Sequence, residues 1–354
     1  MSNVYFLPIK KINRLKEFIK FCNTFDWLKE GQNIALKIHF GNKAHKNNIP
    51  PSYISDIIKI LKEKKTFPFL TDTNVLYRGE RDNTFKHFEI VYLNNYQSLG
   101  IPIIIIGGFK GDYEKEVDVK FSHFDKVFVA KEILEVDGIV AITHFKGHML
   151  AGIGGSIKNI GMGCASRKGK FAMHSDISPL INIESCKGCG ICAKNCPVNA
   201  ISIINKKANI DKKLCIGCSQ CIHVCPINAI SIPWSSVTPK IFQERLVEYA
   251  ASIILKYKGK FSAINYLINI TVDCDCCHNP GEILVDDIGI LISNDPVAID
   301  KASIDLIKEK EGKKFGKGVD KFLAVRPNVS YQYQLNYAEK IGLGTTKYQL
   351  IEFQ

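Results

Sequence analysis

The sequence contains no long uninterrupted run of apolar residues. Its longest apolar stretch, residues 101–109, is much shorter than the roughly 20 residues that a membrane-spanning helix requires. The first eight residues have no basic leader and no small-residue cleavage site, both of which a secretory signal peptide would show. We therefore expect a cytoplasmic protein that does not bind a membrane.

Arginine is also scarce, although the chain is basic. Lys and Arg total 47 against 35 Asp and Glu, which gives a formal net charge of +12, but only six of the basic residues are Arg. Base readout and tight phosphate recognition favour arginine side chains interleaved with aromatic ones. We therefore expect no nucleic-acid partner. The excess of lysine leaves open a docking groove for an acidic electron-transfer protein.

What the sequence does contain is an alternation of strand-like and helix-like segments. Hydrophobic residues make up 46% and charged residues 23% of the 354 residues, which is ordinary for a globular protein. The expected strands are residues 33–40, 67–71, 101–106, 126–130, 138–143, 264–272 and 288–293. The expected helices are residues 13–30, 53–64, 85–98, 240–257 and one that begins at Asp295-Pro296. This alternation predicts an α/β fold with a mostly parallel sheet.

Eight of the thirteen cysteines lie between Cys186 and Cys225, in two copies of the pattern C-x2-C-x2-C-x3-C-P. This is the signature of bacterial two-cluster ferredoxins, in which the fourth cysteine of each run ligates the other cluster. A zinc ribbon uses two pairs of cysteines and does not need two runs of four. One [4Fe-4S] cluster is therefore expected on Cys186, Cys189, Cys192 and Cys225. The second is expected on Cys215, Cys218, Cys221 and Cys196.

The cysteine runs interrupt the α/β pattern, which resumes after them. We therefore expect residues 179–235 to form a small α+β domain of the bacterial ferredoxin type, inserted into a host α/β domain. The host would consist of residues 1–178 and 236–354, with both parts packed on one sheet.

A glycine-rich segment, residues 143–164, follows a predicted strand. Its glycines, of which Gly152, Gly154 and Gly155 stand together, would let the backbone approach a cofactor, and a helix that opens after them would present free amides to an anion. No complete G-x-G-x-x-G or G-K-[ST] pattern is present. The alternative is a turn that needs glycine for close packing. The basic side chains that could contact the same ligand are Lys158, His148 and His174.

A second unusual segment, Asp273-Cys274-Asp275-Cys276, stands at the end of the predicted strand 264–272, where α/β folds place ligands. In an extended chain the two thiols would point to one side and the two carboxylates to the other. The segment is then either a metal or redox site or a pair of buried soft hydrophobes.

These segments resemble the domain-of-unknown-function family number 362, iron-sulfur centre proteins of anaerobic bacteria and archaea. The resemblance rests on HFKGHMLAGIGGSIKNIGMG, on the cysteine runs, and on DCDC followed by DIGILISNDPVAIDKAS. It implies an architecture more than a reaction. The chain is also faintly similar to the N-terminal half of nickel-dependent lactate racemase, which places a His, a Lys ten residues later and a second His sixteen residues beyond around a nickel pincer cofactor. His148, Lys158 and His174 have this spacing.

Together these features favour an anaerobic oxidoreductase in which two [4Fe-4S] clusters relay low-potential electrons to or from a small molecule, or a flavin or metal, in the host domain. The residues expected to act on that molecule are Lys158, His148, Asp273, Cys274, Asp275 and Cys276. One alternative is a non-catalytic electron-transfer subunit that docks partner proteins. Another is a nickel-using isomerase with an accessory cluster domain.

Overall fold

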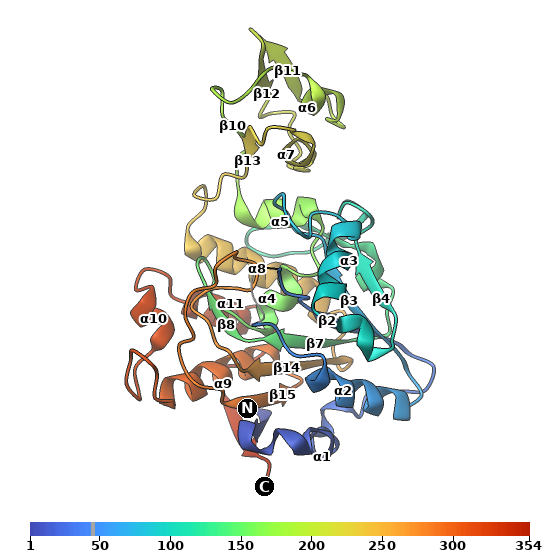
Figure 1. The fold of residues 1–354 in the computed structure, drawn as a ribbon, viewed down its shortest axis with the longest axis vertical. Helices are drawn as coiled ribbons and strands as arrows, with labels where there is room; N and C mark the ends of the chain where they lie inside the picture. The colour runs from blue at the N-terminus through green and yellow to red at the C-terminus, as the bar shows by residue number, and fades with distance from the viewer. Residues whose placement is uncertain (44–46) are drawn as a thin grey trace.

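A computed structural model describes residues 1–43 and 47–354, and its centre is one large sheet (Figure 1). The strands of this sheet are β1 (Ser2–Pro8), β2 (Asn33–Ile38), β3 (Phe67–Thr73), β4 (Ile103–Ile106), β7 (Gly138–His144), β14 (Phe261–Leu267), β15 (Gly289–Ser293) and β16 (Tyr348–Glu352). Their spatial order is β16-β1-β15-β14-β7-β2-β3-β4. Within the described residues only β15 runs antiparallel to its neighbours in this sheet. The prediction of an α/β fold with a mostly parallel sheet is therefore confirmed.

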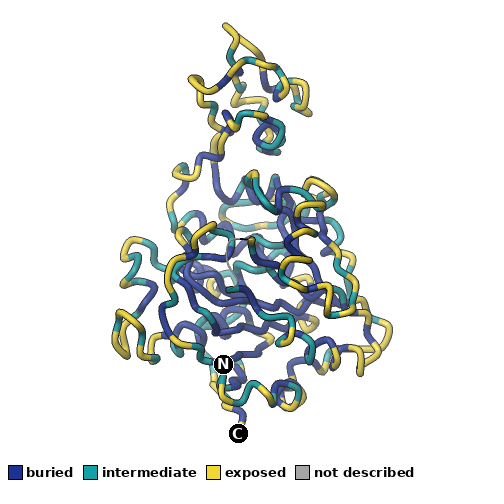
Figure 2. Tube along the Cα trace, viewed as in Figure 1, coloured by how far each residue is buried: buried dark blue, intermediate teal, exposed yellow. Residues whose placement is uncertain are grey.

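Two separate hydrophobic cores cover the two faces of the sheet. Strand β7 shows why, because its side chains alternate between the faces. Ile139 and Ala141 lie in one core, while Val140 and Ile142 lie in the other. All seven residues of β7 are buried, as expected for a central parallel strand that is covered on both sides. Figure 2 shows the same pattern as a continuous buried centre.

Helices supply the outer layers. One face is covered by α1 (Leu15–Phe21), α2 (Ser52–Glu63) and α3 (Thr84–Leu93). The other is covered by α4 (Ser156–Gly161), α8 (Pro239–Ile254), α9 (Pro296–Glu309) and α11 (Gln332–Lys340). Helix α9 begins as predicted, since the Asp295 carboxylate accepts hydrogen bonds from the amides of Val297 and Ala298, both at 2.9 Å.

Some predicted elements differ from the observed ones. The helix expected at 13–30 is only α1, because Cys22 is extended and a 3-10 turn, Asn23–Phe25, follows it. The strand expected at 126–130 forms as β6 (Lys126–Ala130) but pairs with β5 (Glu114–Asp118) outside the main sheet. Strand β14 ends at Leu267, five residues before the predicted end of that strand, because Asn269 adopts a positive φ of 45° and turns the chain.

The cysteine runs lie in a small lobe that stands beyond α5 (Arg167–His174) in Figure 1. We call residues 180–231 the cysteine lobe. Its elements are β10 (Leu180–Ile181), α6 (Ile191–Lys194), β11 (Ile201–Ile204), β12 (Lys207–Ile210), α7 (Gln220–Val224) and β13 (Ile230–Ser231). Its four strands form two two-stranded sheets, in which β10 pairs with β13 and β11 pairs with β12. The main sheet contains strands that precede this lobe in the sequence and strands that follow it, so the chain leaves the sheet to form the lobe and then returns.

Candidate functional site

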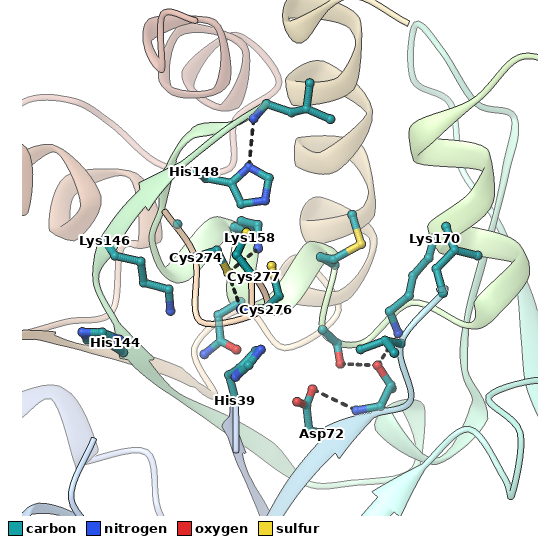
Figure 3. Close-up of a pocket in the computed structure, with 18 of the residues that line it drawn as sticks. His39, Asp72, His144, Lys146, His148, Lys158, Lys170, Cys274, Cys276 and Cys277 are labelled. Carbon is teal, nitrogen blue, oxygen red and sulfur yellow. Dashed lines mark hydrogen bonds between the residues drawn. The ribbon is translucent and has the colours of Figure 1, made fainter. Parts of the chain in front are cut away.

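A cavity of about 440 Å³ opens at the carboxyl ends of β2, β3 and β7. Parallel sheets characteristically bind ligands at this end. Further parts of its wall come from the loop after β3, β8 (Lys146–His148), β9 (Gly152–Gly154), α4, α5, α8 and the loop that follows β14. Figure 3 shows the polar side chains that these elements direct toward one another.

At the centre of the cavity, Lys158 meets the cysteines of the second unusual segment. The Lys158 Nζ atom lies 3.5 Å from the Cys274 Sγ atom. The donor atoms of His148, Cys274 and Cys276 all lie within 4.8 Å of one another, and Cys277 lines the same wall. Four of the residues expected to act on a small molecule are therefore neighbours, although they come from β8, α4 and a loop more than a hundred residues later (Figure 3).

The proton on His148 is positioned by its hydrogen bonds. Its Nδ1 atom accepts hydrogen bonds from the backbone amides of Leu150, at 3.1 Å, and Ala151, at 3.0 Å. Because Nδ1 uses its lone pair in this way, the neutral ring carries its proton on Nε2. Burial, followed by the nearby Lys158 charge, holds the pKa of His148 well below its usual value. His148 is therefore neutral at pH 7 and a hydrogen-bond donor through Nε2.

Buried ion pairs surround this centre. Lys37 Nζ lies 2.9 Å from Asp72 Oδ1, and Arg81 lies 3.7 Å from the other oxygen of the same carboxylate. Asp275 is 1% exposed and accepts contacts of 2.8 Å from both Lys146 Nζ and His144 Nδ1. Burial opposes the charge on Asp275, but its two partners outweigh burial and hold the pKa of Asp275 well below its usual value. Asp275 therefore acts as an anchor for Lys146.

Lys170, on α5, is a further buried cation of the cavity wall. Its ammonium group donates to the Thr73 hydroxyl, and to the carbonyl oxygens of Asn74 and Ala165 at 2.8 Å each. Burial lowers the pKa of Lys170 to about 7. The three acceptors match the three protons of an ammonium group, so this side chain ties α5 to the end of β3.

An aromatic wall closes one side of the cavity. His174 stacks on Phe242, with ring centroids 4.6 Å apart, and meets Trp234 edge-on at 4.7 Å. Burial lowers the pKa of His174 to about 3, so this ring is neutral at pH 7. His174 thus lines the same cavity as Lys158 and His148.

The extended geometry expected for residues 273–276 is wrong. The Cys277 amide donates to the Cys274 carbonyl at 2.8 Å, so the segment turns instead of continuing β14. Asp273 pairs with Arg326, whose Nη2 atom lies 2.6 Å from its Oδ2 atom, and is not among the residues that line the cavity. The two carboxylates are therefore not a pair, whereas the thiols of Cys274 and Cys276 do lie together.

The first two amides of α4 are not free to bind an anion. The amides of Ser156, at 2.7 Å, and Ile157, at 3.1 Å, both donate to the Asp300 carboxylate, which occupies this helix end. A Cβ atom on Gly155 would lie 2.4 Å from that carboxylate. Gly152 has a φ of +73° and touches the backbone of Tyr331, and it does not line the cavity. Close packing, the alternative interpretation, therefore explains Gly152 and the contact of Gly155 with Asp300, while Gly154 and Gly155 both line the cavity.

The cysteine lobe contains two further small cavities, and their walls follow the predicted crossover. One is lined by Cys186, Cys189, Cys192 and Cys225. The other is lined by Cys196, Cys215, Cys218 and Cys221. Backbone amides donate to three of the sulfurs, from Ala208 to Cys186 at 3.4 Å, from Ala200 to Cys196 at 3.2 Å, and from Ala229 to Cys225 at 3.2 Å. Two groups of four thiols with amide donors fit the ligand set of two [4Fe-4S] clusters.

The loop after β3 joins the cysteine lobe to the main cavity. Arg78 Nη1 donates to the carbonyl of Cys225 at 2.5 Å, and His223 Nε2 lies 2.7 Å from the carbonyl of Leu76. The next residue along this loop, Tyr77, donates its hydroxyl proton to the carbonyl of Cys276 at 3.0 Å. One short segment therefore contacts a cysteine of the lobe and a cysteine of the cavity.

Helix α5 makes the second connection. Phe171 shares a hydrophobic core with Cys186, Cys192, Cys221 and Cys225, and Gly217 lies against its ring. Lys170 and His174, on the same helix, line the main cavity.

Several residues of the site were not predicted from the sequence. These are Lys37, His39, Asp72, Arg81, Lys170 and Trp234. The lining residues His144, Lys146 and Cys277 lie within or next to the two unusual segments. Lys37 lies inside a predicted strand and Asp72 directly follows another, which is a signal that could have found both residues. Lys170 and Trp234 carry no such signal, because tertiary contacts alone bring them to the cavity.

Comparison with known proteins places the chain in a family. The family described as "Domain of unknown function (DUF362)" matches residues 34–305, which is most of the chain, and the chain belongs to this family. A 40-residue segment is 45% identical to the "Ferredoxin-type protein NapF" of Haemophilus influenzae, covering 11% of this chain and 23% of that protein. This match and the cysteine content indicate an iron-sulfur protein. Among the described residues, no helix is long and apolar enough to cross a bilayer.

Two solved structures are similar at low identity. The lactate racemase apoprotein from Thermoanaerobacterium thermosaccharolyticum is 16% identical with a TM-score of 0.41, over 76% of this chain and 51% of that chain. A protein from Thermotoga maritima is 11% identical with a TM-score of 0.45, over 85% of this chain and 59% of its own. The chain thus spans about half of the racemase chain that it matches.

Proposed function

We propose that this member of the DUF362 family is an iron-sulfur oxidoreductase in which electrons pass between two [4Fe-4S] clusters in the cysteine lobe and a small molecule in the main cavity. One cluster would be held by Cys186, Cys189, Cys192 and Cys225, and the other by Cys215, Cys218, Cys221 and Cys196. When bound, such clusters supply single electrons at low potential. The 40-residue match to a ferredoxin-type protein, at 45% identity, supports the assignment of clusters to this chain.

The observation that carries the proposal is the double connection between lobe and cavity. The 76–78 loop contacts the carbonyl of Cys225 on one side and that of Cys276 on the other. Helix α5 packs Phe171 among the lobe cysteines and presents Lys170 and His174 to the cavity. A lobe that served only to dock other proteins would not need to be tied to a cavity in this way.

The side chains of the cavity are suited to handling protons and negative charge. Burial opposes the charge on Lys158, but the negative charge that Cys274 and Cys276 carry as thiolates outweighs burial and raises the pKa of Lys158 above its usual value. It can hold a negatively charged atom of a reacting molecule at the centre of the cavity. His148 offers a proton through Nε2, and Phe242 and Trp234 add an apolar wall to the same cavity.

The test is anaerobic purification followed by analysis of iron, acid-labile sulfide and other metals, with absorption and electron paramagnetic resonance spectra of the reduced protein. We expect about eight iron and eight sulfide per chain, and two interacting S = 1/2 signals. Stoichiometric zinc with little sulfide would contradict the assignment of the lobe. Flavin absorption would identify a further cofactor of the cavity.

A second candidate function is a nickel-using isomerase, and one observation favours it. His148, Lys158 and His174, which have the spacing of the racemase motif, all line the main cavity. Stoichiometric nickel, together with turnover that persists when the clusters are kept oxidised, would select this function over electron transfer.

A further inference from the structure

Three cysteines of the cavity form a compact group that neither cluster accounts for. Cys274, Cys276 and Cys277 all line the cavity wall, close to His148 of β8 (Figure 3). The turn through this segment brings the Cys276 amide to 3.5 Å from the Cys274 sulfur, and the two sulfurs lie within 4.8 Å of each other. Cys274 is 1% exposed, whereas Cys276 is only partly buried.

The surroundings of these thiols are unfavourable for a divalent metal ion. His148 is the nearest nitrogen ligand, but its Nδ1 lone pair accepts two amide protons and its Nε2 atom therefore carries a proton. The ammonium group of Lys158 lies 3.5 Å from the Cys274 sulfur and would repel a cation bound there. Among the described residues that line the cavity, Asp72 is the only carboxylate, and Lys37 pairs with it.

The same surroundings suit a pair of thiols that is oxidised and reduced. An ammonium group and an N–H donor beside a sulfur stabilise the thiolate that forms when a disulfide opens. Two cysteines that are two residues apart in a turn can reach the Cα separation of roughly 4.4–6.8 Å that a disulfide requires.

We propose that Cys274 and Cys276 form a reversible disulfide that faces the cavity and stores two electrons. Its reduction consumes two electrons and two protons, breaks one S–S bond and yields two thiols. With a dithiol as the reductant, a thiolate attacks the more accessible Cys276 sulfur and forms a mixed disulfide. The electron pair of the broken bond goes to Cys274 Sγ, beside Lys158. The second thiol of the reductant then releases Cys276 and forms a cyclic disulfide.

The proton balance follows from the same geometry. The hydrogen bond with Cys276 and burial raise the pKa of the Cys274 thiol well above its usual value, so the released Cys274 sulfur takes up a proton. Cys276 takes the second proton when it is released. Lys158 is then a positioning residue, because it stabilises the leaving sulfur without changing its own bonds.

This inference rests on the proposed function in one respect, the source of electrons in the cell. There, the electrons would come singly from a one-electron donor by way of the cysteine lobe. The contact between the Tyr77 hydroxyl and the Cys276 carbonyl, 3.0 Å long, places the disulfide directly behind the loop that touches that lobe. A two-electron store at this point would match two one-electron centres to a two-electron reaction.

The test is disulfide mapping in the full-length, cluster-loaded protein. The protein is equilibrated anaerobically in buffers of reduced and oxidised dithiothreitol, quenched in acid, labelled with N-ethylmaleimide and digested with trypsin. The peptide 261–301 contains all three cavity cysteines and no others. We expect three labels under reducing conditions and one, on Cys277, under oxidising conditions. Cys274→Ser and Cys276→Ser should abolish the change, whereas Cys277→Ser and the buried control Cys164→Ser should keep it.

The role of Lys158 is tested by rates. Lys158→Met should slow reduction of the disulfide by dithiothreitol about tenfold, because the leaving sulfur loses its cation. Three labels on the peptide at every buffer ratio would overturn the proposal, as would a disulfide between Cys276 and Cys277, or one equivalent of metal that Cys274→Ser releases. Iron content and electron paramagnetic resonance of the same samples report on the clusters separately. Failure of the disulfide with intact clusters is thereby distinguished from failure of the proposed function.

Discussion

Replacing Gly155 with Ala tests whether the glycine-rich segment exists for packing. The new Cβ atom would lie 2.4 Å from the carboxylate carbon and both oxygens of Asp300, a distance at which the carboxylate must move. Gly154→Ala is the matched control. Its Cβ would meet the Lys146 side chain at 3.5 Å, an ordinary contact, and Gly154 lacks a positive φ.

The size of the effect follows from what Asp300 would lose. Its carboxylate accepts hydrogen bonds from the amide of Ser156 at 2.7 Å, the amide of Ile157 at 3.1 Å and the side-chain amide of Asn265 at 2.8 Å. Hydrogen bonds to charged groups contribute about 1.5–3 kcal/mol each. If two of the three are lost, Gly155→Ala should lower the free energy of unfolding by about 4 kcal/mol. Gly154→Ala should lower it by less than about 1 kcal/mol, because the added Cβ makes only ordinary contacts.

The assay is urea unfolding of both variants, followed by far-UV circular dichroism at equal cluster content. Against a total stability of roughly 5–15 kcal/mol, a loss of about 4 kcal/mol is easily measured. We expect the unfolding midpoint of Gly155→Ala to fall by about 1 M urea relative to Gly154→Ala. Equal midpoints for the two variants would refute the packing explanation and return Gly155 to a role in ligand binding.

Three further predictions concern the cysteine lobe and a buried histidine. Cys196→Ala should leave one S = 1/2 signal without spin coupling in the reduced protein, and the cluster that survives should be the one on the Cys186 side; survival of the other would contradict the crossover. If a protein electron donor docks at the lysines of the cysteine lobe, charge reversal at Lys187 and Lys213 should slow electron delivery by that donor. The rate with the unaltered protein should then also fall as salt is added. Burial lowers the pKa of His87 from 6.5 to about 3, so the unfolded state binds more protons below pH 6.5 and stability should fall as pH decreases from 6.5 to 3. A flatter profile for His87→Phe in acid unfolding would support this, and an unchanged profile would contradict it.

Most of the sheet could be predicted from local pattern alone. Residues 33–40, 67–71 and 138–143 are apolar runs of strand length between turns or helices, and they form the central strands β2, β3 and β7. Strands β1 and β16 were missed. They pair with each other across the whole length of the chain, and no local signal marks such a pairing. The antiparallel direction of β15 could not be predicted either, because the direction of a strand depends on the path of the connecting chain and not on the composition of the strand.

The site was predicted only where the sequence is locally unusual. The glycine-rich segment and the DCDC segment drew attention to Lys158 and Cys274, which lie 3.5 Å apart. Lys37 and Asp72 sit inside ordinary strands, and only the parallel register of β2 and β3 makes them a buried pair. Packing and ligand binding require glycine for the same reason, the absence of a Cβ atom, so the sequence leaves both interpretations open for Gly154 and Gly155, which line the cavity.

The buried charges of the cavity bear on the choice between an enzyme and a docking subunit. Lys37 is 1% exposed and Asp72 is 3% exposed, and Lys146 and Asp275 form a second pair that is nearly as deep. Removing such ions from water costs about as much as their attraction returns, and apolar residues of similar size would stabilise the fold equally well or better. Stability therefore does not explain why four charges stand where β2, β3 and β7 end. The proposed function would explain them, because a fixed array of charges around a cavity can orient a reacting molecule without reorganising. A protein that only docked partners would place its charges on the surface instead.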